Sequence, residues 1–162
     1  MHFFAIATLK VKLKYDFESI KNNTELLTQL KSELYSMTKK FKEKKKILGM
    51  LCVCIGYLVT QAQWPNFIEE IIKSFSESLE TIVTAFKILK ELVRTGKDDD
   101  VVISDNRRQR FYREMIEQNA KVLGFLDKWV ENINKEKIPE DTAPELKLKF
   151  LNGVSYSFIV DP

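Results

Sequence analysis

Four arginines stand close together in the stretch NRRQRFYR, and their side chains are suited to meeting acidic groups. They are Arg107, Arg108, Arg110 and Arg113. Positive charge at the start of a helix opposes the helix dipole, so we expect some compensation. The favoured source is a local one, in which the preceding loop folds back and supplies acids, and the alternative is an acidic group on a partner. The local acids are Asp98, Asp99, Asp100 and Asp105.

Catalysis and metal binding find no support in the sequence. His2 is the only histidine, Cys52 and Cys54 are the only cysteines, and there is no CxxC pair. The chain also lacks a phosphate-binding glycine loop and a nucleophile elbow, so we expect no enzyme activity, no zinc site and no cofactor. The run DDD lacks the glycine and later glutamate of a calcium loop. The two cysteines lie in an apolar run and are predicted to be reduced core residues.

A run of lysines is the second charged feature. It consists of Lys39, Lys40, Lys42, Lys44, Lys45 and Lys46. Such a run is compatible with a nuclear localisation signal or a nucleic-acid patch. A solvated loop is favoured, because Phe41 is the only interleaved aromatic residue and the net charge of +3 is mild. A small helical bundle that binds nucleic acid through these lysines is a weaker option, which a steep salt dependence would expose.

An almost uncharged run from Ile47 to Val59 follows the lysines. It is too short for a membrane-spanning helix, which needs roughly 17–25 apolar residues, and it lies too far from the N-terminus for a signal peptide. The remaining interpretation is a helix in a protein core. Because the run is apolar on every side, it must be covered on more than one side, which indicates a stacked fold.

Apolar residues at steps of three and four predict helices over most of the remaining chain. Polar residues before each apolar pattern supply candidate N-caps, in two cases with a glutamate three residues later. The predicted helices cover roughly 22–41, 47–63, 67–75, 78–93 and 106–134, and the predicted caps are Asn22 with Glu25, Asn66 with Glu69, Ser78, and Ser104 or Asp105.

Two segments depart from the helical pattern. Leu9–Tyr15 alternates apolar and basic residues with a period of two, which by itself predicts a strand. The stretch VSYSFIV near the C-terminus is rich in β-branched and aromatic residues and is also a candidate for extended structure. Pattern alone therefore predicts an all-α protein with a strand at each end.

The predicted helices come in pairs. The second members begin near Asn23, Asn66 and Asn106, about 40 residues apart, which is within the range of HEAT-type helical repeats. Each such pair exposes an apolar face that only the next pair covers. The sequence therefore predicts an all-α fold, an α-solenoid of three to four HEAT-type antiparallel helix pairs, partial at both ends.

Several stretches resemble the β-karyopherin family of nuclear transport receptors. FFAIATLKVKL looks like the helix that ends TLK.K in the second repeat of that family. LCVCIGYLVTQAQWPNFIEEIIKSF resembles the third repeat of the transportin-SR and importin-thirteen branch. LETIVTAFKILKELV and NRRQRFYREMIEQNAKVLGFLDKWV resemble the two helices of the fourth repeat. The resemblance covers roughly residues 3–135, and it implies that residues 3–15 are helical, in place of the strand that pattern alone predicts.

The resemblance implies a function and partners. Such receptors carry protein cargo past nuclear pore proteins, shuttle between nucleus and cytoplasm, and bind the GTP form of the Ran GTPase through their N-terminal repeats. The second helix of each pair would line the concave surface. The polar residues that this nominates for binding Ran or cargo are Lys31, Glu33, Glu69, Glu70, Lys73, Arg107, Arg108, Arg110 and Arg113. The alternative for each residue is a solvated face.

The resemblance also sets repeat boundaries and shows departures. Repeat two would span 1–41, repeat three 45–76, repeat four 78–135, and 143–162 would begin repeat five. The family's first repeat is absent, and VRTGKDDD replaces its proline and paired acids. We therefore expect a receptor fragment that self-associates through uncovered end helices, or whose C-terminus is rearranged to cover one of them. The alternative function is a helical-repeat scaffold for protein–protein interaction that is unrelated to transport.

Overall fold

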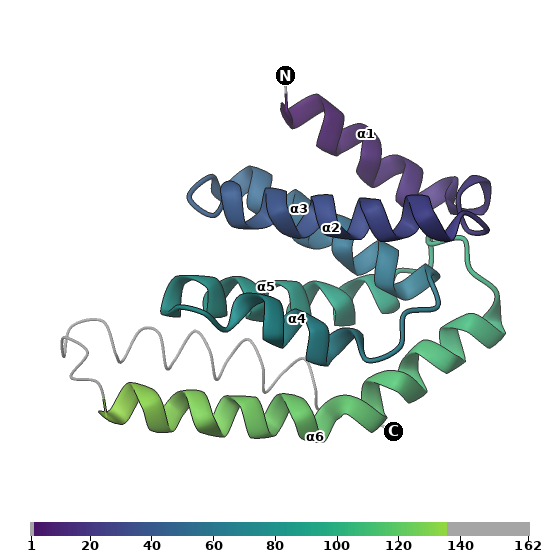
Figure 1. The fold of residues 1–162 in the computed structure, drawn as a ribbon. Coiled ribbons are helices and arrows are strands. Elements are labelled where there is room, and N and C mark those ends of the chain that lie inside the picture. Colours follow the sequence, from purple (N-terminus) through teal and green to yellow (C-terminus); the bar gives the residue numbers. More distant parts are fainter. Residues whose placement is uncertain (1, 136–162) are drawn as a thin grey trace.

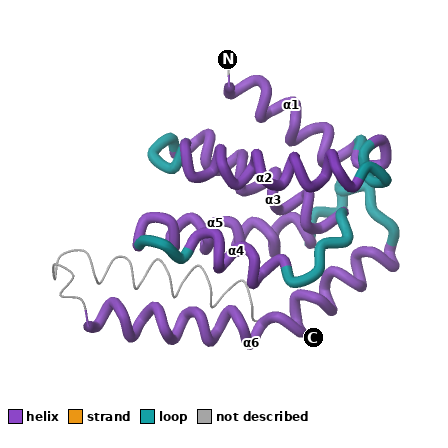
Figure 2. The backbone as a smooth tube through the Cα atoms, viewed as in Figure 1, coloured by secondary structure: helices purple, strands orange, loops and turns teal. Residues whose placement is uncertain are grey.

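The computed structural model describes residues 2–135, which form six α-helices and one short 3-10 helix (Figures 1 and 2). Within this range there is no strand, and the helices pack against one another as an all-α helical-repeat solenoid. This confirms the predicted fold class. The helices are α1 (His2–Tyr15), η1 (Phe17–Ser19), α2 (Thr24–Lys40), α3 (Lys45–Gln61), α4 (Phe67–Phe75), α5 (Leu79–Gly96) and α6 (Asp105–Lys135).

The helices are stacked in order, from α1 at one end to α6 at the other (Figure 1). The first members of successive pairs pack side by side, with α1 against α3 and α3 against α5. The second members lie against this row: α2 packs on α3, α4 packs on α5, and α6 packs on α4. The VSYSFIV segment lies outside the described residues.

Helix α3 is the centre of the stack. Every residue from Leu51 to Gln61 is buried, because α1, α2, α5 and α6 all pack against this helix. This confirms that the apolar run is a core helix covered on several sides. Gly56 permits the closest approach: a Cβ atom on it would lie only 2.8 Å from the hydroxyl oxygen of Thr95 on α5.

Helix α1 contradicts the strand that alternation predicts for Leu9–Tyr15 and agrees with the resemblance. Leu13 is fully buried against the core, whereas Val11 is 55% exposed. A strand would place these two side chains on the same face, but a helix places residues two apart on different sides. Packing against α3 therefore decides between two periodicities that a short segment cannot separate.

Two predicted caps differ from the observed ones. Asn23, not Asn22, caps α2, and its side chain accepts a hydrogen bond from the Leu26 N–H at 2.9 Å. Asn66 adopts the left-handed conformation (φ 56°) and makes no side-chain cap for α4. The other two caps are confirmed. Ser78 forms a capping box with Thr81 at α5, and Ser104 accepts from the Arg107 N–H at α6.

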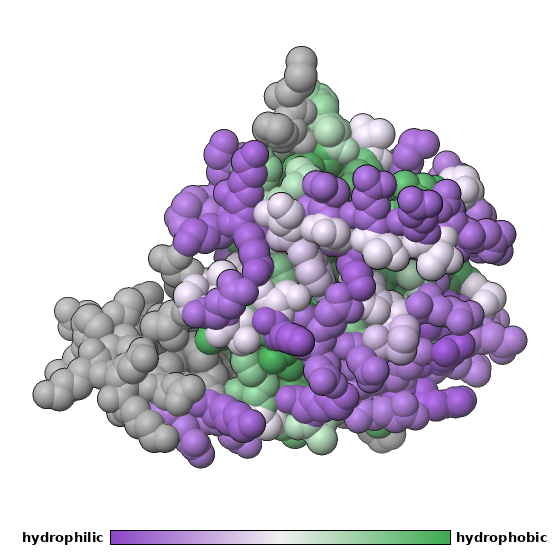
Figure 3. Space-filling view, viewed as in Figure 1, coloured by the Kyte–Doolittle hydropathy of each residue, from purple (hydrophilic) through white to green (hydrophobic). Residues whose placement is uncertain are grey.

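Both end helices carry exposed apolar side chains. Phe4 on α1 is 77% exposed and Ile116 on α6 is 71% exposed. In Figure 3 apolar surface is visible next to the N-terminal end of the stack, whereas hydrophilic side chains cover much of the rest of this face. None of the helices described is long and apolar enough to cross a lipid bilayer.

Candidate protein-binding surface

Ion pairs connect the second helices of the three pairs. Lys31 on α2 pairs with Glu70 on α4 at 2.9 Å, and Lys121 on α6 pairs with Glu69 on α4 at 2.7 Å. Five of the nine residues predicted to bind a partner (Lys31, Glu33, Glu69, Glu70 and Lys73) therefore lie on α2 and α4, and the four arginines lie on α6. These three helices form the candidate surface.

Lys31, Trp64 and Glu70 form one compact cluster on this surface. The Lys31 ammonium group lies 4.6 Å from the centre of the Trp64 ring, within range of a cation–π interaction. The indole N–H of Trp64 donates a hydrogen bond to Glu70 at 2.7 Å. Each charge of the cluster therefore has an internal partner, and an incoming protein has to exchange these contacts rather than meet bare charges.

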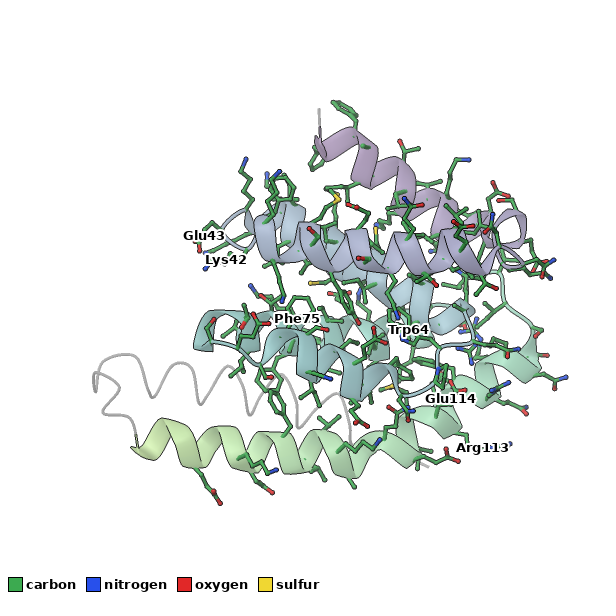
Figure 4. The ribbon with its side chains drawn as sticks, viewed as in Figure 1. Lys42, Glu43, Trp64, Phe75, Arg113 and Glu114 are labelled. Carbon is green, nitrogen blue, oxygen red and sulfur yellow. The ribbon has the colours of Figure 1, made fainter. Side chains whose placement is uncertain are left out.

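Two further aromatic rings continue the cluster between α2 and α4. Tyr35 lies 6.0 Å from Trp64 and 5.3 Å from Phe75, measured between ring centres. Figure 4 shows Trp64 and Phe75 on the side of α4 that faces α2. The Tyr35 hydroxyl is buried without a hydrogen-bond partner, and burial together with the negative charge of Glu70 raises its pKa. This tyrosine therefore stays neutral and anchors α2 through packing.

Glu69 and Lys73 lie one turn apart on the exposed side of α4. The hydrogen bond from Lys121 holds the pKa of Glu69 below its ordinary value, with a small contribution from the charge of Lys73. Among the described residues no ion pair is formed by Lys73, nor by Glu33, which is exposed on α2. Both side chains are directly available to a partner.

Arg107 is a structural residue. Its guanidinium donates to the backbone oxygens of Val59 and Ala62 at the end of α3 and pairs with Glu114 at 3.1 Å. Its side chain is only 10% exposed. Cationic groups are favourable at the C-terminus of a helix because they meet unpaired carbonyls and the negative end of the dipole. Arg107 therefore joins α6 to α3.

Arg108 acts in the same way at the end of α5. It donates to the backbone oxygens of Gly96 at 2.6 Å and of Asp98 and Val101 at 3.3 Å. The loop thus folds back onto the arginines as the sequence predicts, but it offers carbonyl oxygens rather than carboxylates. The prediction that the loop acids neutralise the arginines is wrong for Asp98 and Asp100, whose carboxylates bind Lys14 instead.

The remaining two arginines face outward. Arg110 pairs with Glu114 at 2.9 Å, one turn further along α6. Arg113 is exposed, forms no ion pair with another described side chain, and lies at the outer edge of the stack in Figure 4. Of the four clustered arginines, Arg113 is therefore the one most open to a partner.

Sequence reasoning missed the network around Asp98. Lys14 on α1 pairs with Asp98 at 3.0 Å, and the Tyr57 hydroxyl donates to Asp98 at 2.9 Å. Burial alone would raise the pKa of Asp98, but these two hydrogen bonds, together with one from the Asp100 N–H and the charge of Lys14, outweigh it and lower the pKa. Burial and the same carboxylate raise the pKa of Tyr57 to about 12. No local pattern could reveal these contacts, since Lys14 and Asp98 are 84 residues apart.

An open pocket of about 760 Å³ adjoins the candidate surface. The end of α3, the start of α2 and the loop before α6 surround it, and both Lys31 and Arg107 contribute to its wall. Its apolar lining includes Phe17, Leu27, Trp64 and Ile103. No local sequence pattern indicates this pocket, because its walls come from three separate segments.

No group of three or more histidine, cysteine, aspartate or glutamate side chains is arranged to hold a metal ion within the described range. Cys52 and Cys54 are free, buried thiols, and burial raises the pKa of each to about 12. Neither thiol is activated as a nucleophile.

A family model described as Exportin 1-like protein matches residues 44–160. The chain belongs to the exportin 1-like family. The match begins just before α3 and includes the whole of α4, α5 and α6. No curated protein and no solved structure matches the chain.

Membership of the exportin 1-like family confirms the β-karyopherin resemblance at the level of the importin-β and exportin family. Proteins of this family are nuclear transport receptors rather than enzymes, and they shuttle between nucleus and cytoplasm. The match does not distinguish branches of the family, so the transportin-SR and importin-thirteen branch stays a prediction.

Proposed function

We propose that this exportin 1-like chain supplies part of the Ran-binding arch of a nuclear transport receptor that carries protein cargo through the nuclear pore. The family match is the observation that carries the proposal. The helix pairs α1/α2, α3/α4 and α5/α6 would correspond to repeats two, three and four; residues 143–162, assigned from the sequence to the start of repeat five, lie outside the described residues. The GTP form of Ran, cargo and nuclear pore proteins are the partners, and the protein shuttles between nucleus and cytoplasm.

The candidate surface suggests how the roles divide. Glu33, Lys73 and Arg113 are exposed and are proposed to touch Ran directly. Lys31, Glu69, Glu70 and Arg110 already have ionic partners, so they would bind by exchanging one partner for another. Such exchange favours specificity over affinity, since only a surface with matching charges replaces the lost pairs.

Arg107 and Arg108 have a different part in this proposal. Their hydrogen bonds go to backbone oxygens of α3, α5 and the loop before α6. They are proposed to position α6, and thereby Arg113, rather than to contact Ran. Substituting them should lower stability together with binding, whereas substituting Arg113 should lower binding alone.

Binding to Ran tests the proposal. Fluorescently labelled Ran, loaded with a non-hydrolysable GTP analogue or with GDP, is titrated with this chain and with a longer form that adds a preceding repeat. Selective binding of the GTP form supports the proposal. The charge-reversing variant Lys73→Glu/Arg113→Glu should then bind at least about tenfold more weakly, because two attractions become repulsions.

The matched control reverses two exposed charges elsewhere. Lys87→Glu/Lys90→Glu makes the same charge change on α5, which lies in the other row of helices. Equal loss of binding in both variants would point to a general charge effect and count against the surface. If neither form of the chain binds either state of Ran, the alternative of a protein-interaction scaffold unrelated to transport replaces the proposal.

A further inference from the structure

The turn between α2 and α3 presents a concentrated positive surface, which we call the lysine corner. It comprises Lys40, Lys42, Lys44, Lys45 and Lys46, all exposed, around the single acid Glu43. Figure 4 shows Lys42 and Glu43 at the tip of the turn, directed away from the helices. The lysine corner thus projects from the stack and is mainly cationic.

The lysine corner is held in a fixed shape. The Phe41 side chain is only 7% exposed and anchors the turn in the core. Backbone hydrogen bonds of 2.9 Å run from the Phe41 N–H to Met37 and from the Lys44 N–H to Phe41. The lysines are therefore displayed on an ordered turn, and ordering this backbone costs a partner little.

Most of these charges are not neutralised internally. In the part of the chain that the structure describes, no carboxylate pairs with Lys40, Lys44, Lys45 or Lys46. Lys40 and Lys44 instead lie over the Phe41 ring, 5.7 Å and 5.5 Å from its centre. By contrast, Lys39, just before the corner, is paired with Glu77 at 3.3 Å. The corner therefore carries net charge that an external anion could meet.

The position of these lysines disfavours the helix that follows them. Lys44 is the N-cap residue of α3 and makes no side-chain cap, and Lys45 and Lys46 open the first turn, which contains no acid. Helix N-termini are stabilised by acids and by capping side chains and are destabilised by cations. These lysines therefore reduce the stability of the start of α3, and a binding role would account for that cost.

We propose that the lysine corner binds an acidic, extended segment of another protein. A single nucleic-acid strand fits less well, because it needs exposed aromatic rings for base stacking and the Phe41 ring is covered. Glu43 at the tip would also repel a continuous phosphate backbone, whereas a peptide can place its acids on either side of it. This surface differs from the one proposed for Ran and does not depend on that proposal.

The test uses a fluorescein-labelled glutamate-rich peptide, with a glutamine-rich peptide and oligouridine RNA of equal length as comparison probes. Anisotropy titrations are run on the whole chain at low and high salt. The decisive variant is Lys45→Glu/Lys46→Glu, and Lys87→Glu/Lys90→Glu is the control with the same charge change on α5. Thermal unfolding of each protein is measured in parallel.

The proposal predicts opposite effects on binding and stability in the decisive variant. Peptide affinity should fall about tenfold or more, while the unfolding midpoint should rise by about 2 °C, because the two new acids favour the start of α3. The control variant should keep most of the affinity. Salt should weaken peptide binding.

Three results would overturn the proposal. The first is absence of peptide binding at low salt. The second is equal loss of affinity in the decisive and the control variants, which would mean that net charge alone attracts the peptide. The third is tighter binding of oligouridine than of the glutamate-rich peptide, which would assign the lysine corner to nucleic acid.

Discussion

The side-chain oxygen of Gln118 on α6 accepts a hydrogen bond from the backbone N–H of Ile68 on α4, at 3.3 Å. Asn66 at the start of α4 makes no side-chain cap. The Gln118 contact therefore takes the place of a local cap for this helix. A residue 50 positions away thus completes α4, the helix that carries Glu69, Glu70 and Lys73.

Replacing the buried Gln118 should lower the free energy of unfolding more than replacing an exposed glutamine on the same helix. Gln118→Ala leaves a buried N–H without an acceptor, which costs about 1–3 kcal/mol in the free energy of unfolding. Gln109→Ala removes an exposed glutamine from the same helix and should change stability by less than about 0.5 kcal/mol. Urea denaturation measures both. Equal effects would mean that the Gln118 contact contributes nothing to stability.

Gly56 and Gly49 both lie on α3, and alanine should affect them with opposite signs. Gly49→Ala meets no atom within 4 Å, so it should raise the free energy of unfolding by about 0.5–1 kcal/mol through helix propensity. Gly56→Ala places its methyl group 2.8 Å from the Thr95 oxygen and 2.9 Å from its methyl carbon. The overlap should cost about 1–3 kcal/mol, which exceeds the propensity gain.

A double variant tests the cause of the Gly56 effect. Thr95→Ala removes the side-chain atoms that the new methyl group would meet, at the cost of the Thr60 hydrogen bond. Gly56→Ala/Thr95→Ala should therefore be more stable than the sum of the two single effects predicts. Strict additivity would show that close packing between α3 and α5 is not responsible.

Arg108 and Arg113 separate a structural arginine from an exposed one. Arg108→Ala leaves backbone oxygens of Gly96, Asp98 and Val101 without this donor, and should lower the free energy of unfolding by about 1–3 kcal/mol. Arg113→Ala should leave it unchanged within about 0.5 kcal/mol. Chemical denaturation of the two variants decides the point, and similar losses in both would contradict the assigned roles.

Asp98 should make stability depend on pH in the acid range. Lys14 and Tyr57 together lower its pKa from the ordinary value of 3.8 despite the opposing effect of burial. The ionised form is therefore favoured by folding. Its contribution is fully present above pH 3.8 and is lost as the pH falls through the lowered pKa of the folded state.

Comparison with Asp98→Asn isolates this effect. The wild-type protein should be more stable than the variant at neutral pH, and the difference should shrink steadily below pH 3.8. Unfolding free energies measured across the acid range check this. A difference that stays constant down to the lowest pH at which the protein folds would rule out an Asp98 carboxylate stabilised by Lys14 and Tyr57.

Local features of the fold could be predicted from the sequence. The buried character of Leu51–Val59 follows from a run with no charge to solvate, and the caps at Ser78 and Ser104 follow from side chains that reach N–H groups only three residues away. The alternation in Leu9–Tyr15 wrongly predicts a strand, because a short apolar–basic pattern fits both the strand period and the helix period. Packing against α3, rather than the pattern, selects the helix.

For the candidate site, the sequence predicts which helices carry the charged residues but not how those residues pair. Periodicity placed Lys31, Glu70 and the arginines on the second helix of each pair, but it could not tell which charges were already paired. Arg108 and Arg113 are five residues apart on one helix, yet one holds backbone oxygens and the other is exposed. That difference depends on where the end of α5 lies.

The sequence by itself determined α2 to α6, most of their boundaries and the apolar centre of the stack, because those depend on residues within one or two turns. The tertiary structure decided the Gln118 cap on α4, the Lys31 contact with Trp64 and the partners of Asp98. Each of these joins segments tens of residues apart, so it exists only once stacking of the helices fixes their distance and rotation.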